Sequence, residues 1–186
     1  MSSRLRITGG KWVRHRIDVP KQGVRPTTDR ARESVFAILS DMLEQKTVLD
    51  LFAGSGALGL EALSRGASAV HFVESHGPNA AVLTKNIQAL GATAQTKVHK
   101  MQAKTFLKKN PALRFDYIFV DPPYALSLES WWSEQFVSML LPGGQIILER
   151  DAHEELPEHW LQHFKLMREK KFGTAHVRFL MSRDEH

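Results

Sequence analysis

The fold of this chain is decided by the stretch TVLDLFAGSGALG, residues 47–59. Its first half, 47–53, is mostly apolar, which predicts a buried strand. Its second half, Gly54–Gly59, has the pattern Gly-x-Gly-x-x-Gly, and we call it the glycine loop. A helix is expected over 57–65, because a glycine follows and ends it. A strand, a glycine-rich turn and a helix in this order let the backbone approach a ligand closely at the start of the helix.

Two acidic residues indicate which ligand the glycine loop binds. Alone, the loop is equally compatible with a nicotinamide dinucleotide. Asp50, however, ends the first strand, where a carboxylate would repel a pyrophosphate but suits an ammonium group, directly or through water. Glu74 ends the next predicted strand, 69–74, and follows Gly54 by 20 residues, the spacing at which an acid reaches ribose hydroxyls. The sequence therefore predicts S-adenosylmethionine, which has both an adenosine ribose and a cationic amino-acid end.

A second motif, Asp121-Pro122-Pro123-Tyr124, follows the strand predicted over 115–120. Ligands of open α/β sheets bind at the carboxyl ends of strands. A carboxylate there accepts hydrogen bonds from an exocyclic amine. A proline fixes φ and removes an N–H, so that neighbouring carbonyls can face a ligand. A tyrosine ring can stack on an extruded base. These four residues are therefore the candidate catalytic group.

The positive charge of the chain is concentrated at its start. Residues 1–32 hold nine Lys and Arg against two Asp, whereas the whole chain has a net charge of +5. Such a segment indicates a partner with a phosphate backbone; the alternative is a solvated basic arm without a specific partner. A membrane surface is disfavoured, because the segment has no amphipathic helix. The residues expected to bind nucleic acid are Arg4, Arg6, Lys11, Arg14, Arg16, Arg25, Thr27, Arg30 and Arg32.

Length and composition favour one globular domain without a metal or a membrane span. A chain of 186 residues with 42% hydrophobic residues can bury a substantial core. No apolar run approaches 18 residues, and no signal peptide is recognisable. The absence of cysteine excludes disulfides and cysteine-ligated zinc, and suits the cytoplasm. The nine histidines show no metal-binding spacing.

Strands and helices alternate along the chain, which predicts an α/β fold with a mostly parallel sheet and helices on both faces. A β-hairpin is expected at the start, with strands over 4–8 and 12–19 joined by a turn at Gly9-Gly10. Two strands close the chain without a helix between them, so the last one should be antiparallel. The other expected helices are 29–45, 77–90, 103–109, 130–141 and 156–162, and the other strands are 95–100, 145–149, 165–168 and 175–180.

These motifs together resemble the bacterial RsmD family of class I S-adenosylmethionine-dependent methyltransferases. The resemblance rests on the glycine loop, the Asp-Pro-Pro-Tyr motif, RITGG at 6–10 and RPTTDR at 25–30, and extends from Arg4 to about Leu180. It implies methylation of a guanine N2 amine in small-subunit ribosomal RNA, either as RNA or in a small-subunit assembly intermediate. It also implies a seven-stranded sheet with a reversed terminal strand, a basic N-terminal hairpin over 1–26 and a methyltransferase domain over 27–186.

The resemblance also implies which residues bind the cofactor. Gln102 stands where relatives tend to carry Asn or Asp for the adenine edge, and an amide can still accept a hydrogen bond from an adenine amine. His15 stands where relatives tend to carry glycine. The implied cofactor-binding residues are Asp50, Phe52, Gly54, Ser55, Gly56, Glu74, Ser75, Gln102 and Ala103.

Two other functions use the same residue types. A DNA adenine-N6 or cytosine-N4 methyltransferase can carry Asp-Pro-Pro-Tyr, but it usually has a separate target-recognition domain, for which 186 residues leave little room. A non-catalytic nucleic-acid-binding protein can retain the fold, but the intact glycine loop and the presence of both Asp121 and Tyr124 favour an enzyme.

Overall fold

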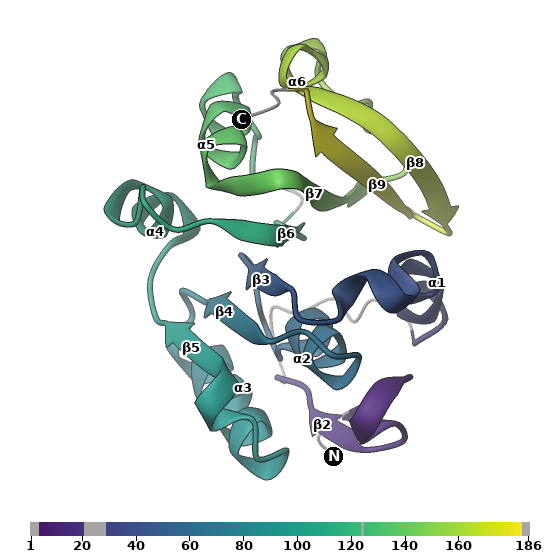
Figure 1. The fold of residues 1–186 in the computed structure, drawn as a ribbon, viewed down its shortest axis with the longest axis vertical. Helices are drawn as coiled ribbons and strands as arrows, with labels where there is room; N and C mark the ends of the chain where they lie inside the picture. The colour runs from purple at the N-terminus through teal and green to yellow at the C-terminus, as the bar shows by residue number, and fades with distance from the viewer. Residues whose placement is uncertain (1–3, 21–28, 124, 184–186) are drawn as a thin grey trace.

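A seven-stranded sheet forms the centre of the computed structural model, which describes residues 4–20, 29–123 and 125–183 (Figure 1). The strand order is β5-β4-β3-β6-β7-β9-β8. Neighbouring strands from β5 to β7 are parallel, whereas β9 is antiparallel to both β7 and β8. The predicted mostly parallel sheet with a reversed final strand is confirmed. The strands are β3 (Thr47–Asp50), β4 (Ala69–Val73), β5 (Thr96–His99), β6 (Phe115–Val120), β7 (Leu140–Asp151), β8 (Phe164–Phe172) and β9 (Ala175–Ser182).

Helices cover both faces of this sheet, as predicted. Figure 1 shows α4 and α5 on the left of the sheet and α1 on its right. The central strand β6 explains the apolar run at 117–120, because Tyr117 and Phe119 pack into one buried cluster while Ile118 and Val120 pack into the other. The helices are α1 (Asp29–Leu39), α2 (Ala57–Ser64), α3 (Gly77–Ala89), α4 (Ala103–Lys109), α5 (Ser130–Met139) and α6 (Glu158–His163), with 3-10 turns η1 (Gly10–Trp12), η2 (Ser40–Leu43) and η3 (Thr93–Gln95).

The glycine loop has the conformation and the packing that only glycine permits. Gly56 has a φ of 82°, and a Cβ there would lie 2.4 Å from the side chain of Leu83 on α3. A Cβ on Gly59 would lie 2.3 Å from the ring of Phe72 on β4. The loop therefore lets α2 pack directly on the sheet while the chain turns sharply after β3.

Two helix predictions were wrong at their ends. The helix expected over 130–141 ends at Met139, and β7 begins at Leu140, where it pairs with Phe115. The register then shifts, so that Tyr117 pairs with Gln145. Pro142-Gly143-Gly144 lies inside this irregular strand, because a bulge accepts proline and a glycine with a φ of 74°. The helix expected over 29–45 ends at Leu39 and continues as η2.

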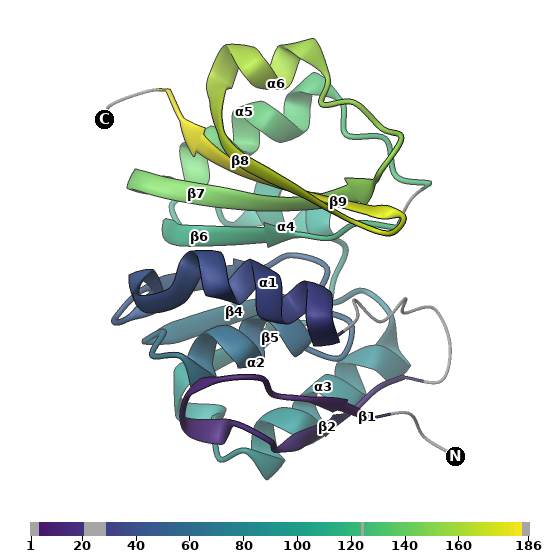
Figure 2. The same cartoon turned by 90° about the vertical axis from the view of Figure 1, so that its right-hand side faces the viewer.

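The N-terminal hairpin (residues 4–18) consists of β1 (Arg4–Arg6) paired with β2 (Arg16–Asp18). The expected tight turn at Gly9-Gly10 was wrong, because η1 extends the connection between the strands. The two glycines allow the hairpin to contact α2 closely, because a Cβ on Gly10 would lie 1.8 Å from the Ser64 carbonyl oxygen. Ile7 and Ile17 are buried in the same cluster as α1, α2 and α3. The N-terminal hairpin is thus packed against the sheet domain (Figure 2).

A buried carboxylate joins the N-terminal hairpin to α2. Glu61 is 0% exposed and accepts hydrogen bonds from the Thr8 N–H at 2.8 Å and the Thr8 hydroxyl at 2.7 Å. It also pairs with Arg65 Nε at 2.9 Å and Arg32 Nε at 3.5 Å. Arg32 is itself 1% exposed and donates to the Arg6 carbonyl. The network thus places the buried negative charge of Glu61 beside two guanidinium groups, which compensate it.

Asn86 forms a second connection, between the N-terminal hairpin and the glycine loop. Its amide oxygen accepts the Asp18 N–H at 2.9 Å, and its amide nitrogen donates to the Asp18 carbonyl at 2.9 Å. The same nitrogen donates to the Ser55 carbonyl at 2.9 Å. One side chain on α3 therefore holds both segments.

Candidate active site

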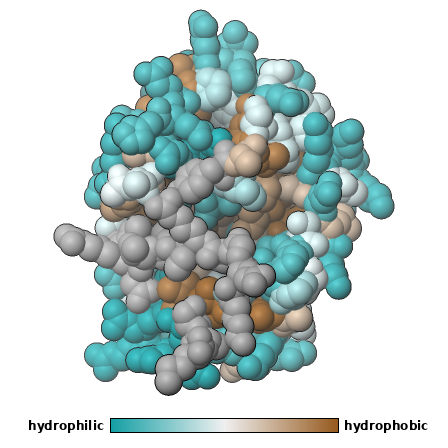
Figure 3. All heavy atoms as spheres, turned by 180° about the vertical axis from the view of Figure 1, so that it is seen from behind, coloured by the Kyte–Doolittle hydropathy of each residue, from teal (hydrophilic) through white to brown (hydrophobic). Residues whose placement is uncertain are grey.

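A cavity of about 950 Å³ opens at the carboxyl ends of β3, β4 and β6. Seen from this edge of the sheet, apolar residues gather between hydrophilic ones near the middle of the molecule (Figure 3). Tyr124 lies outside the described residues. The other residues expected from the sequence that line the cavity are Phe52, Gly54, Glu74, Ser75, Gln102, Ala103, Asp121, Pro122 and Pro123.

Glu74 connects the end of β4 to the glycine loop. Its Oε2 accepts the Gly54 N–H at 2.8 Å, and its Oε1 accepts the His76 N–H at 2.7 Å. A carboxylate has about four acceptor sites, so both oxygens can accept further hydrogen bonds from a ligand. Since Glu74 also lines the cavity, its geometry fits a pair of ribose hydroxyls.

Asp50, Ser55 and Gly56 do not line the cavity but shape its glycine loop. Asp50 is 2% exposed, and its Oδ2 accepts the Gly59 N–H at 3.0 Å in the first turn of α2. Burial raises the pKa of Asp50 to about 7; the Gly59 hydrogen bond opposes this rise, and the negative charge of Glu74 adds to it. The buried Asp50 carboxylate thus holds the end of the glycine loop in place through the Gly59 N–H.

One end of the cavity has an apolar wall. The rings of Phe52 and Trp132 contact each other at a tilt, with centroids 6.3 Å apart, and Ala103 lines the same cavity at the start of α4. Gln102 is the N-cap residue of α4, but its side chain makes no capping hydrogen bond, which leaves its amide for a ligand. A flat apolar ring with a polar edge, such as adenine, fits this end.

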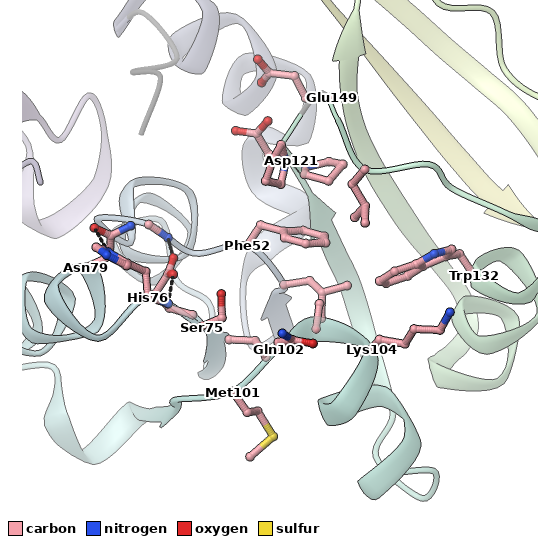
Figure 4. A pocket seen from close by; sticks show the side chains of 18 residues that line it. Phe52, Ser75, His76, Asn79, Met101, Gln102, Lys104, Asp121, Trp132 and Glu149 are labelled. Atoms are coloured by element: carbon pink, nitrogen blue, oxygen red, sulfur yellow. Dashed lines mark hydrogen bonds between the residues drawn. The ribbon is translucent and has the colours of Figure 1, made fainter. Parts of the chain in front are cut away.

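The opposite end of the cavity carries two carboxylates. Asp121 follows β6 and Glu149 lies near the end of β7, the neighbouring strand. Figure 4 shows both at the end of the cavity away from Gln102 and Met101. The sequence interpretation missed Glu149, although it ends the strand expected over 145–149 and so repeats the pattern of Asp50, Glu74 and Asp121.

Several other lining residues were also missed. His76 and Asn79 come from the start of α3, and His76 Nδ1 lies 3.1 Å from Asn79 Oδ1. Trp132 and Leu126 follow the Asp-Pro-Pro-Tyr motif, and they resemble ordinary core residues in the sequence. The missed residues are Leu51, Val73, His76, Asn79, Met101, Lys104, Leu126, Trp132 and Glu149.

Of the residues expected to bind nucleic acid, those on the N-terminal hairpin are exposed, whereas the prediction for Arg32 was wrong. Arg32 was expected to bind nucleic acid, but it is 1% exposed because it neutralises the buried Glu61. Arg25, Thr27 and the side chain of Arg30 lie outside the part of the structure that is described. The residues that lie exposed on the N-terminal hairpin are Arg4, Arg6, Lys11, Arg14 and Arg16.

The described residues contain neither a helix long and apolar enough to cross a bilayer nor a group of three or more His, Asp or Glu able to hold a metal ion.

Comparison with known proteins gives matches over nearly the whole chain. A family model described as "Conserved hypothetical protein 95" matches residues 5–181. Ribosomal RNA small subunit methyltransferase D of Haemophilus influenzae is 36% identical over 185 residues, covering 94% of this chain and 92% of the relative. The protein of the same name from Escherichia coli is 35% identical over 187 residues, covering 95% and 89%.

Solved structures of other proteins also match this chain. The putative methyltransferase yhhF from Escherichia coli has a TM-score of 0.84 at 34% identity, covering 97% of this chain and 98% of that chain. The Thermus thermophilus 16S rRNA N2 G1207 methyltransferase, in complex with AdoMet and guanosine, has a TM-score of 0.77 at 21% identity, covering 98% and 50%, and so shares the fold. The chain therefore belongs to the family described as "Conserved hypothetical protein 95", the RsmD family, and has the class I methyltransferase fold.

Proposed function

We propose that this protein transfers a methyl group from S-adenosylmethionine to the exocyclic N2 amine of a guanine in small-subunit ribosomal RNA. The names of its relatives support ribosomal RNA methylation. The observation that carries the choice of guanine is the pair of carboxylates, Asp121 and Glu149, at one end of the cavity whose other end fits adenosine.

The residues present fit S-adenosylmethionine. The apolar wall formed by Phe52, Trp132 and Ala103 would pack against the adenine ring, with Gln102 at its amine edge. Glu74 would accept the ribose hydroxyls, and the amino-acid end would lie against the glycine loop, where Gly54 lines the cavity. When bound, this cofactor supplies an electrophilic methyl group on a sulfonium centre.

Asp121 and the Pro122 carbonyl would orient the attacking amine. The lone pair of an aromatic amine is delocalised into its base, so the amine is a weak nucleophile. Two acceptors bound to its two N–H groups fix its direction and stabilise the positive charge that grows on nitrogen in the transition state. Holding the amine close to the methyl group for in-line displacement supplies much of the remaining rate. Asp121 need not be a strong base, because the amine becomes acidic only as the new bond forms.

Glu149 extends this argument to the choice of base. Guanine presents three donors along one edge, the N1–H and the two N2 hydrogens. Asp121, Pro122 and Glu149 supply three acceptors at this end of the cavity. Adenine and cytosine present a ring-nitrogen acceptor next to their amine, and an acceptor held against a carboxylate is repulsive. The arrangement therefore favours guanine over the targets of an adenine-N6 or cytosine-N4 methyltransferase.

The remaining parts of the chain would deliver the RNA. Residues 1–26 would bind its phosphates through the exposed arginines of the N-terminal hairpin, and residues 27–186 would carry the chemistry. Tyr124 would stack on the extruded guanine. Because the substrate is made and assembled in the bacterial cytoplasm, the protein would act there.

The test is the identity of the methylated nucleoside. Purified protein is incubated with S-adenosylmethionine and either naked small-subunit RNA or small subunits, and the digested nucleosides are identified by mass spectrometry against standards. N2-methylguanosine is the expected product. Methyladenosine, methylcytidine or a guanosine methylated at N1 or N7 would overturn the proposal.

Glu149 variants test base recognition separately. Glu149→Ala should lower kcat/KM by about tenfold or more, because the base would lose a hydrogen-bond partner worth about 1–3 kcal/mol. Glu149→Gln keeps an acceptor of similar shape and should be milder. If both variants matched the wild-type enzyme, Glu149 would have no role in recognising the base.

A further inference from the structure

The segment 75–115 contains seven Lys and Arg and neither Asp nor Glu. The net charge of this segment thus equals that of residues 1–32. The net charge of the whole chain is lower because acidic residues outnumber basic residues in the rest of the chain. Five of its lysines form what we call the basic band: Lys97, Lys100, Lys104, Lys108 and Lys109, all exposed.

The basic band runs from the edge strand β5 onto α4, which covers one face of the sheet. Lys97 lies on β5, the edge strand, and Lys100 follows its end. Lys104, Lys108 and Lys109 come from α4, which contains no acidic residue. Within the described residues, no ion pair joins these five lysines to a carboxylate. Lys104 and Lys108 are four residues apart on one helix, where like charges repel and lower helix stability. A polyanion would relieve this repulsion.

The basic band begins at the mouth of the active-site cavity. Lys104 is one of the residues that line the cavity. The Nζ of Lys100 lies 3.2 Å from where a Cβ on Gly77 would be, beside His76, another lining residue. Lys100 and Lys104 therefore flank the wall formed by Met101, Gln102 and Ala103, so that a ligand on the band is also next to the cavity.

An aromatic ring lies within the basic band. Lys104 Nζ is 5.0 Å and Lys108 Nζ is 5.7 Å from the ring centroid of Trp131, which is half-buried on α5. Trp131 packs edge-on against Trp132, a residue of the cavity wall, with centroids 5.3 Å apart. Exposed cations around an aromatic ring are the combination with which proteins bind single-stranded nucleic acid.

The basic band and the N-terminal hairpin lie on different sides of the sheet. The hairpin packs into the buried cluster under α1, α2 and α3, whereas α4 packs into the other cluster with α5. Figure 1 shows α4 on the left and the hairpin at the lower right. The two basic surfaces are therefore separate.

We propose that the basic band is a second RNA-binding surface, so that the substrate RNA contacts the enzyme on both sides of the cavity mouth. This inference rests on the proposed function, since it assumes that the substrate is RNA. The N-terminal hairpin would hold one segment of the RNA, and the basic band would hold another by its phosphates, with Trp131 offering a stacking face.

The test compares two triple variants that change charge equally. Lys97, Lys108 and Lys109 are replaced with glutamine, which avoids the cavity residues. In the control, Lys165, Lys170 and Lys171, exposed on β8 at the opposite edge of the sheet, are replaced with glutamine. Affinity for small-subunit RNA is measured over a range of salt concentrations, with S-adenosylhomocysteine binding as a check on the cofactor site.

The basic-band variant should reduce the slope of log affinity against log salt by about two to three, roughly one unit per lost phosphate contact. Its KM for RNA should rise while kcat and S-adenosylhomocysteine binding stay unchanged, and the control should keep the wild-type slope. A wild-type slope in the basic-band variant, or an equal loss in the control, would refute the second surface. If instead the wild-type enzyme methylated no RNA, the proposed function itself would fail, independently of the slopes.

Discussion

The contact between Glu61 and the N-terminal hairpin gives the sharpest test of how the hairpin is attached. Glu61→Gln keeps the size of the side chain but removes its charge. The Arg32 guanidinium, 1% exposed, would then remain buried beside a neutral group. One of the two amide positions would also present hydrogens to Thr8 or Arg65, which are donors themselves.

Removing one partner of a buried ion pair costs about 3–5 kcal/mol. For a domain of this size, each kcal/mol lowers Tm by about 2–4 °C, so the variant should melt about 6–20 °C below the wild-type protein. Calorimetry or circular dichroism measures this directly, and urea unfolding gives the free energy.

Asp18→Asn is the matched control. Like Glu61→Gln, it changes a carboxylate to an amide, but at a position on the N-terminal hairpin itself. Asp18 pairs with Arg4 at 2.9 Å and Lys85 at 2.8 Å, but both partners are exposed. Exposed pairs contribute at most about 1 kcal/mol. Equal melting temperatures for the Glu61→Gln variant and the control would refute the assignment of the Glu61 network as the attachment of the hairpin.

Three further predictions concern the site. Glu74→Ala should weaken S-adenosylhomocysteine binding by about 1–3 kcal/mol by calorimetry, because the ribose hydroxyls lose their acceptor; unchanged affinity would remove Glu74 from that role. Asp121→Ala should lower kcat far more than cofactor affinity, since its hydrogen bonds strengthen in the transition state, and near wild-type turnover on RNA would contradict this. The folded pKa of Asp50 is raised from 3.8 to about 7, so its protonated form favours folding below pH ~4, and this contribution is lost as pH rises through ~7. Relative to Asp50→Asn, the free energy of unfolding should therefore fall by on the order of 4 kcal/mol over that range; a difference independent of pH would contradict the burial argument.

Local patterns in the sequence predict most of the sheet and the cavity. Strands buried on both faces contain continuous apolar runs, as at 117–120 in β6, and turns between them are marked by glycine and proline. Acids at strand ends could be recognised because parallel strands deliver their last residues to one edge, which brings Glu74 and Asp121 into the same cavity.

The predictions that were wrong concern residues whose structure depends on contacts with residues far away in the sequence. Arg32 looks like a surface cation until Glu61, 29 residues later, is found beside it. Gly9-Gly10 has the pattern of a tight turn, yet its need for glycine comes from Ser64 on α2. The helix pattern continues through Leu140, but pairing with Phe115 makes that residue part of a strand. None of these partners can be identified from local sequence.

The position of β9 has a consequence for how the chain is made. Of the seven strands, β9 is synthesised last, yet it lies between β7 and β8. Until it emerges from the ribosome, β7 exposes an unpaired hydrogen-bonding edge and β8 has no neighbour in the sheet, a state prone to wrong pairing with other chains. The β8–β9 hairpin is local in sequence and can form by itself within microseconds, so we expect it to dock on β7 as a unit. In a chain that ended after Phe172, β7 and β8 would both lack the strand with which they pair. Chaperones and proteases should recognise such a chain as incomplete.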